Sequence, residues 1–269
     1  MAASPQAIPF PRSFNAAPEI RRVAFDAPWA WLDRGWKDLW SSPGLSVTYG
    51  AAFAAIAYLF IFQLLRIHAL PLILPLAGGF MLLGPLLAVG LYEISRRRER
   101  HEQTSLRDVA LAVRKSGSQL AYLGVLLLLL YFFWMQVASL LFMLFFGNAD
   151  IPPLENFIPT LLFKPHGLGL LVTGTAVGAL FAFAAFGLSA IAAPMLFDRK
   201  VDVITAVSTS LKAVNKNRPA MILWAALITG MIAMGFIALF AGLAIAFPLI
   251  GHATWHAYRD LMGTAPSLT

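Results

Sequence analysis

The chain contains no cysteine. Disulfide bonds, iron–sulfur clusters and thiolate metal sites are therefore excluded, because each of them needs cysteine sulfur. The sequence also lacks a nucleophile elbow, a phosphate-binding loop and a paired-carboxylate arrangement suited to acid–base catalysis. We therefore predict no catalytic residue and no cofactor, and we expect that the protein is not an enzyme.

Charge is also scarce, since 12% of the residues are charged and 59% are hydrophobic. A chain this apolar needs a bilayer as its solvent. Its long uncharged runs cover residues 45–65, 67–92, 116–149, 165–197 and 219–258. A helix needs roughly 20 apolar residues to cross the hydrocarbon core, so the last run is long enough for two crossings. We predict an all-α integral membrane protein with six transmembrane helices, at about 45–65, 70–92, 119–146, 167–190, 219–240 and 242–258.

The two ends of the chain differ from the part between them. Residues 1–18 hold four prolines with little apolar periodicity, which predicts a flexible N-terminal tail. Residues 19–260 form the predicted membrane domain, and residues 261–269 form a short C-terminal tail.

The cations fall almost entirely on one side of the predicted topology. Of the 20 Lys and Arg residues, only Arg66 and Lys164 lie on the other side. Short cytoplasmic loops carry the excess of Lys and Arg, which predicts a bacterial inner-membrane protein with both termini in the cytoplasm. The net charge of +7 is then a topology signal and an attraction to anionic headgroups. We do not predict nucleic-acid binding, because no separate soluble domain is present to carry it.

The chain is predicted to contain three copies of one unit, each an amphipathic helix followed by a transmembrane hairpin. The amphipathic helices begin at about Asp26, at Thr104 or Ser105, and at Asp202, residues that favour helix starts. Cations lie opposite their apolar faces, so each helix is expected to lie in the membrane plane on the cytoplasmic side. The three predicted apolar faces comprise Trp29, Leu32, Trp36 and Leu39; Leu106, Val109, Ala110 and Val113; and Val203, Ala206, Val207, Leu211 and Val214.

The even-numbered spans also resemble one another. Residues 85–96 align with residues 248–259, so that a proline, an aromatic residue and an arginine coincide. Residues 194–199 end the fourth span in a looser version of the same pattern. This repeat favours two crossings in the run 219–258, whose division otherwise depends on its length and on Gly242.

Three segments carry a resemblance to a known family. They are residues 29–39 (WAWLDRGWKDL), residues 84–93, which contain Gly84-Pro85 and Gly90-Leu-Tyr92-Glu93, and residues 247–259 (FPLIGHATWHAYR). The chain resembles the bacterial integral membrane family known as domain of unknown function 2189. This resemblance implies an inner-membrane protein without an established activity. Some relatives carry a loose label as cytochrome oxidase subunits.

His252, His256 and Glu93 are the candidate metal ligands. The two histidines are four residues apart and share one helix face, and Glu93 is the repeat counterpart of His256. In the alternative interpretation, all three are polar interfacial residues that bond to arginine or to headgroups.

Other residues carry weaker signals. Candidate contacts with anionic lipid are Arg96, Arg97, Arg98, Arg100, Arg199 and Lys200. Gly174 and Gly178 form a small-residue stripe that predicts close helix packing, within the bundle or with a membrane-protein partner or a second copy. Prolines and glycines between residues 71 and 85 break the second span, and this break favours either kinked packing or a transport site.

We interpret the protein as a non-enzymatic membrane scaffold or accessory protein. Its alternatives are a transporter or channel for a small solute, and a metal-handling or oxidase-assembly factor. Neither the substrate nor the partner follows from the sequence.

Overall fold

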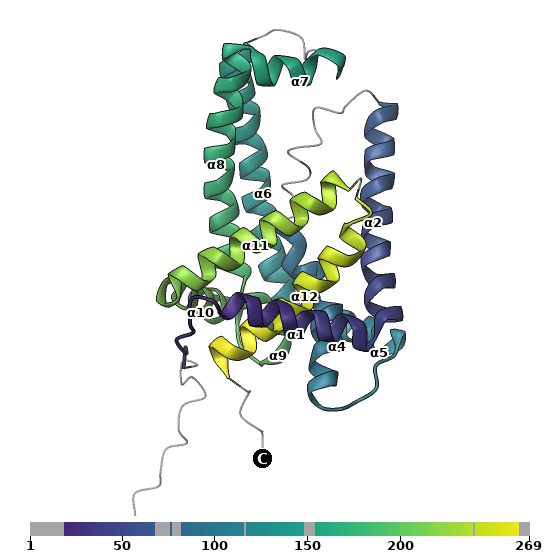
Figure 1. The fold of residues 1–269 in the computed structure, drawn as a ribbon. Coiled ribbons are helices and arrows are strands. Elements are labelled where there is room, and N and C mark those ends of the chain that lie inside the picture. The colour runs from purple at the N-terminus through teal and green to yellow at the C-terminus, as the bar shows by residue number, and fades with distance from the viewer. Residues whose placement is uncertain are drawn as a thin grey trace, which may run out of the picture.

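The structure is a computed structural model that describes residues 19–67, 76, 82–115, 117–147, 154–238 and 240–263. Every regular element in these ranges is a helix (Figure 1). The N-terminal tail, most of the break at 71–85 and residues 264–269 lie outside them. The helices are α1 (Ala27–Ser41), α2 (Pro43–Arg66), α4 (Val89–Glu99), α5 (Leu106–Lys115), α6 (Gly117–Phe146), α7 (Leu154–Phe163), α8 (Pro165–Ser189), α9 (Ala192–Asp198), α10 (Val203–Lys216), α11 (Arg218–Ile237) and α12 (Leu243–Met262).

Four helices are long and apolar enough to cross a membrane. They are α2, α6, the continuous stretch Pro165–Asp198 that joins α8 to α9, and α11. The predicted second span, 70–92, lies partly outside the described residues. The predicted sixth span corresponds to α12, which has the length of a span but carries His252, His256 and Arg259. Because most of α12 is buried inside the protein, its polar residues meet other helices instead of lipid.

The amphipathic helices gather at one end of the molecule, which we call the basic end. It comprises α1, α5, α9, α10 and the arginine-rich C-terminus of α4, whereas α7 lies at the opposite end (Figure 1). Each amphipathic helix packs against a neighbouring helix: α5 on α4, α10 on α8 and α9, and α1 on α12. The contact of α1 with α12 brings together helices from opposite parts of the chain.

Local sequence explains where two of these helices begin. The backbone N–H of Ser105 donates to Asp108 Oδ2 (3.0 Å), and the Asp108 N–H donates back to Ser105 Oγ (3.3 Å). This reciprocal pair is a capping box at the start of α5. Asp202 caps α10 by accepting from the Thr205 N–H (2.8 Å). Both predicted starts are confirmed, whereas Asp26 makes no side-chain cap on α1.

The residues of the predicted apolar face of α1 differ in exposure. Leu39 is buried, but Trp29 and Trp36 are exposed. The face that packs on α12 comprises Pro28, Trp31, Gly35, Asp38 and Leu39. Gly35 permits this contact, because a Cβ there would lie 2.8 Å from the backbone nitrogen of Ala253. A heptad pattern cannot distinguish a tryptophan that faces another helix from one that faces the membrane interface.

The hydrophobic core lies towards the basic end, around α4, α9 and α12. The largest side chains that are fully buried include Trp31, Trp224 and Trp255. In contrast, α2 and α6 expose most of their apolar surface along the spans. The structure therefore combines a packed, partly polar base with long apolar helices suited to lipid contact.

Candidate functional site

A buried polar network lies where helices α1, α2, α4 and α12 meet. Its members are Asp38, Ser46, Ser95, His252 and His256, and all of them are buried. Ser46 Oγ lies 3.0 Å from His252 Nε2, and Ser95 Oγ lies 2.8 Å from His252 Nδ1. Ser95 donates to Asp38 Oδ2 at 2.5 Å, and His256 Nε2 lies 2.9 Å from the same oxygen. Residues more than 200 positions apart in sequence are thus joined by one chain of hydrogen bonds.

The hydrogen bonds of this network have a deducible direction. The single hydroxyl proton of Ser95 goes to Asp38, so towards His252 the Ser95 oxygen can only accept. His252 Nδ1 therefore carries a proton. With the imidazole neutral, Nε2 is an acceptor, and the Ser46 hydroxyl donates to it. Every bond then points from Ser46 through His252 and Ser95 towards the Asp38 carboxylate.

Asp38 is the acceptor on which the network converges. Besides Ser95 and His256, it accepts from Arg98 NH1 at 2.5 Å through its other oxygen. Burial by itself raises the pKa of Asp38. The hydrogen bond and the charge of His256, with the hydrogen bond from Ser95, outweigh burial and hold the pKa below its ordinary value. The carboxylate is therefore the ionised centre of the buried site.

A second cluster surrounds Glu93, two residues before Ser95 on α4. Its two carboxylate oxygens face Arg96 NH2 (2.6 Å) and Arg97 Nε (2.9 Å). Arg97 also reaches Asp108 at 3.1 Å and so connects α4 to the start of α5. The hydrogen bond to Glu93 is the main reason why the pKa of Arg97 is raised.

A third cluster connects α9 to the end of α12. The Tyr258 hydroxyl donates to Asp198 Oδ2 (2.8 Å) and accepts from Arg199 Nε (2.8 Å). Arg199 also donates to the carbonyls of Met262 (2.9 Å) and Gly263 (3.0 Å). These bonds fix the C-terminus of α12 against the end of α9.

The repeat-equivalent aromatic residues meet at the centre of these clusters. Tyr92, Phe197 and Trp255 are the aromatic residues at the positions that the predicted repeat pairs. Each ring contacts the other two, with centroid distances of 6.4, 6.3 and 6.2 Å. Arg96 lies over the Phe197 ring at 4.8 Å. The positions that the sequence repeat pairs are therefore brought together around one axis of the fold.

The candidate metal ligands are occupied by other partners. Both ring nitrogens of His252 face serines, His256 Nε2 faces Asp38, and Glu93 faces two arginines. Within the described ranges, no group of three or more His, Asp or Glu side chains is placed to hold a metal ion. The metal site thus stays a prediction that this geometry does not favour.

Most of the predicted lipid-contact cations also have partners within the protein. Arg96 and Arg97 pair with Glu93, Arg98 pairs with Asp38, and Arg199 bonds to Tyr258. Arg100 and Lys200 are exposed. The arginine-rich end of α4 therefore holds helices together, and a test of lipid contact needs other cations.

The predicted packing glycines on α8 face different surroundings. A Cβ on Gly178 would lie 3.2 Å from the Trp134 ring, so Gly178 packs against α6 inside the bundle. A Cβ on Gly174 would meet nothing within 4 Å.

Sequence reasoning missed three members of the network: Asp38, Ser46 and Ser95. One signal was available, because Trp31, Gly35 and Asp38 follow helical spacing and place a carboxylate in line with a tryptophan and a glycine. Ser46 and Ser95 carry no such signal, since a single serine in a helix is common.

The network can pass protons along its length and can hold four helices in register. A serine next to an imidazole that is connected to a carboxylate also resembles a nucleophile–base arrangement. However, Ser46 has no exposed surface, so a substrate atom cannot reach its hydroxyl in this structure.

One comparison with known proteins found a family match. Residues 72–198 match a family described as predicted integral membrane protein (DUF2189). The resemblance predicted from the sequence is confirmed. The match includes the motif at 84–93, whereas those at 29–39 and 247–259 lie outside the matched residues. No curated protein and no solved structure matches the chain.

Proposed function

We propose that the protein is a non-enzymatic membrane scaffold or accessory protein whose basic end binds anionic lipid headgroups. The observation that carries this proposal recurs on all three amphipathic helices. Each one exposes two apolar residues seven positions apart, and an exposed cation directly follows the second. The sets are Trp29, Trp36 and Lys37 on α1; Leu106, Val113 and Arg114 on α5; and Ile204, Leu211 and Lys212 on α10.

An apolar pair seven residues apart lies on one helix face, two turns apart. Because each helix also has a buried face against the bundle, this outward pair is a second apolar surface. Apolar side chains at the headgroup boundary with cations beside them suit an anionic bilayer surface. Three such sites at the basic end would bind that surface together and orient the bundle on it.

Thermal unfolding in detergent tests the proposal. Added phosphatidylglycerol is expected to raise the midpoint of the wild-type protein more than phosphatidylcholine does, because a ligand that binds only the folded state stabilises it. A variant with Lys37, Arg114 and Lys212 changed to Gln should lose this difference. Arg66 and Lys164, which lie away from the basic end, provide the control when changed to Gln. If the triple variant keeps the full preference for phosphatidylglycerol, the proposal is wrong.

The proposal includes a topology of six crossings in a bacterial inner membrane, with both termini and the basic end in the cytoplasm. The concentration of cations at one end supports it. Because the chain has no cysteine, single cysteines report their side without background. In spheroplasts, an impermeant maleimide should label Lys164→Cys but not Lys200→Cys or Ser267→Cys. If Ser267→Cys is labelled and Lys200→Cys is not, the number of crossings is odd.

Binding of a membrane-protein partner or a second copy stays a proposal. The two alternative functions, a small-solute transporter or channel and a metal-handling or oxidase-assembly factor, stay proposals too. The transporter reading depends on residues 71–85, most of which lie outside the described ranges. The metal reading depends on His252, His256 and Glu93, whose hydrogen bonds and ion pairs compete with metal ligation. The metal content of protein purified in mild detergent tests that alternative.

A further inference from the structure

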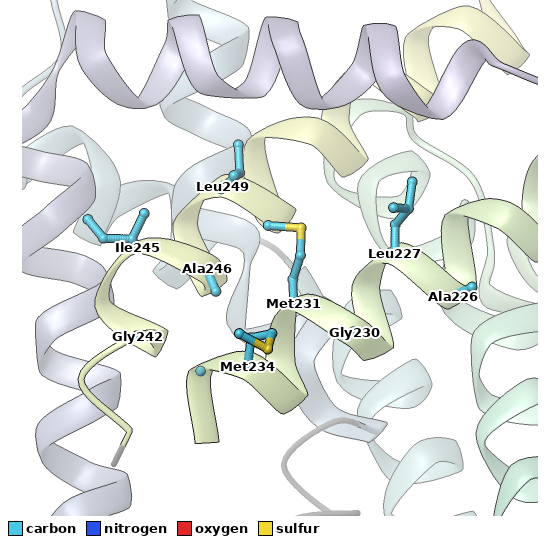
Figure 2. A pocket seen from close by; sticks show the side chains of 10 residues that line it. Ala226, Leu227, Gly230, Met231, Met234, Gly242, Ile245, Ala246 and Leu249 are labelled. Carbon is cyan, nitrogen blue, oxygen red and sulfur yellow. The ribbon is translucent and has the colours of Figure 1, made fainter. Parts of the chain in front are cut away.

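A hollow lies between α11 and α12, and its lining residues do not belong to the basic end. It has a volume of about 390 Å³, and Figure 2 shows side chains of both helices around it. Its lining is almost entirely apolar and includes Leu227, Met231 and Met234 of α11 with Ile245, Ala246 and Leu249 of α12. We call this hollow the α11–α12 wedge.

The wedge begins where the two helices meet. A Cβ on Gly242 would lie 2.9 Å from the Gly235 Cα, so the helices touch near the turn that joins them. Beyond that contact, Gly230 leaves open space, since a Cβ there would meet nothing within 4 Å. Gly230 is exposed, and Met234 is 65% exposed, so the wedge opens to the surroundings of the protein.

By length and composition α11 is one of the four candidate spans, so the open side of the wedge is expected to face hydrocarbon. Water does not fill an apolar hollow that offers it no hydrogen-bond partner. An empty hollow loses dispersion contacts along its whole lining. An apolar occupant from the membrane is therefore favoured over water in the hollow and over an empty hollow.

Size distinguishes the two apolar occupants that a membrane offers. A helix about 10–12 Å wide displaces roughly 400–600 Å³ in each 5.4 Å turn, so the wedge would take one turn at most. A methylene group is similar in size to a water molecule, whose share of liquid volume is about 30 Å³. The wedge therefore has room for roughly a dozen methylenes, which is most of one acyl chain. The two methionines suit such an occupant, because their flexible thioethers adapt to irregular apolar shapes.

We propose that the α11–α12 wedge is a lipid-binding site that holds one acyl chain of a membrane phospholipid. The bound chain adds packing between α11 and α12 beyond their close contact at Gly235 and Gly242.

Photo-crosslinking tests this site. The full-length protein is reconstituted in vesicles of phosphatidylglycerol and phosphatidylcholine that contain a phospholipid with a mid-chain diazirine, and adducts are mapped by mass spectrometry. Adducts should concentrate on residues of the wedge in α11 and α12. Gly230→Leu adds a side chain at the hollow, where a Cβ would meet nothing within 4 Å, and should abolish this concentration.

Gly174→Leu is the matched control. Gly174 is also a glycine of a candidate span whose Cβ would meet nothing within 4 Å, but it lies on α8. This variant should keep the wedge adducts, and unfolding midpoints show that both variants are folded. Adducts spread evenly over α2, α6 and α8 and unchanged by Gly230→Leu would overturn the proposal. Disulfide-linked dimers of Ala226→Cys would also overturn it, because they would place a second copy in the wedge.

Discussion

At the scale of single residues, the carboxylate of Asp38 is the most consequential group in the protein. It accepts hydrogen bonds from Ser95, His256 and Arg98, which come from two different helices. Removal of one member of a buried charged pair is costly, because the remaining charge loses its compensation. This reasoning applies to Asp38 because it is only 4% exposed.

We expect Asp38→Ala to destabilise the folded protein by about 2–4 kcal/mol, because the buried Ser95 and His256 donors lose their acceptor, whereas the 40% exposed Arg98 can be hydrated. Thermal or denaturant unfolding in detergent measures the change. Asp33→Ala is the matched control, since Asp33 is exposed on the same helix and pairs only with exposed Lys37. Equal effects of the two substitutions would contradict a central role for Asp38.

Asp38 also predicts a pH dependence of stability. Its pKa in the folded protein is lowered, whereas an unfolded aspartate titrates near pH 3.9. The stabilisation is therefore present above about pH 4 and is lost as the pH falls through the folded pKa. The stability gap between the wild-type protein and Asp38→Asn should narrow below about pH 4. Asp108 and Asp202 also have lowered pKa values, but both proteins contain them, so their effects cancel. A gap that stays constant to pH 3 would argue against the assignment.

At the scale of elements, the contact of α1 with α12 depends on a glycine. A Cβ on Gly35 would lie 2.8 and 3.0 Å from the backbone nitrogen and Cα of Ala253. Backbone atoms cannot rotate away, so α1 would have to move from α12. This movement would also disturb the Trp31 Nε1 hydrogen bond to Asp260 (2.8 Å) and the Asp38 network.

We expect Gly35→Ala to lower stability by about 1–3 kcal/mol, although alanine is the better helix former. Gly44→Ala is the control, because Gly44 is a helical glycine of α2 whose Cβ would meet nothing within 4 Å. The control should be neutral or slightly stabilising in the same unfolding assay. A stabilising Gly35→Ala would mean that α1 and α12 are not in close contact.

At the scale of the whole molecule, hydrogen bonds join the segment before α1 to parts of the chain that lie far away in the sequence. The Arg21 N–H donates to the Leu261 carbonyl at 2.8 Å. Asn217, in the turn between α10 and α11, accepts from the Val23 N–H (2.9 Å) and donates to the Arg21 carbonyl (3.0 Å). One buried amide therefore anchors the segment that precedes α1.

We expect Asn217→Ala to release this segment and to expose the bonds after Arg21 and Arg22 to trypsin. The expected readout is faster cleavage at these sites, mapped by mass spectrometry, with little change elsewhere. Asn215→Ala is the control in the same turn. Asn215 is exposed, and its side chain accepts a hydrogen bond from Arg218, three residues away. If both variants are cleaved equally fast, the anchor is not Asn217.

Much of the architecture could be predicted from local patterns. The capped starts of α5 and α10 follow from Ser105, Asp108 and Asp202, whose side chains act within three residues. Long apolar helices follow from uncharged runs. The burial of α12 could not be predicted this way, because hydropathy indicates only that a segment leaves water, and lipid and protein interiors are both apolar.

The sequence by itself determined the membrane class and the concentration of cations at one end. These properties depend on composition and on residues close together in the chain. Only the tertiary structure decided that Trp31 faces inward while Trp29 and Trp36 face outward, and that Asp38, Ser46, Ser95 and His252 share one network. The physical reason is that a hydrogen bond acts over about 3 Å. Its partners therefore become neighbours only once helices from both ends of the chain have packed together.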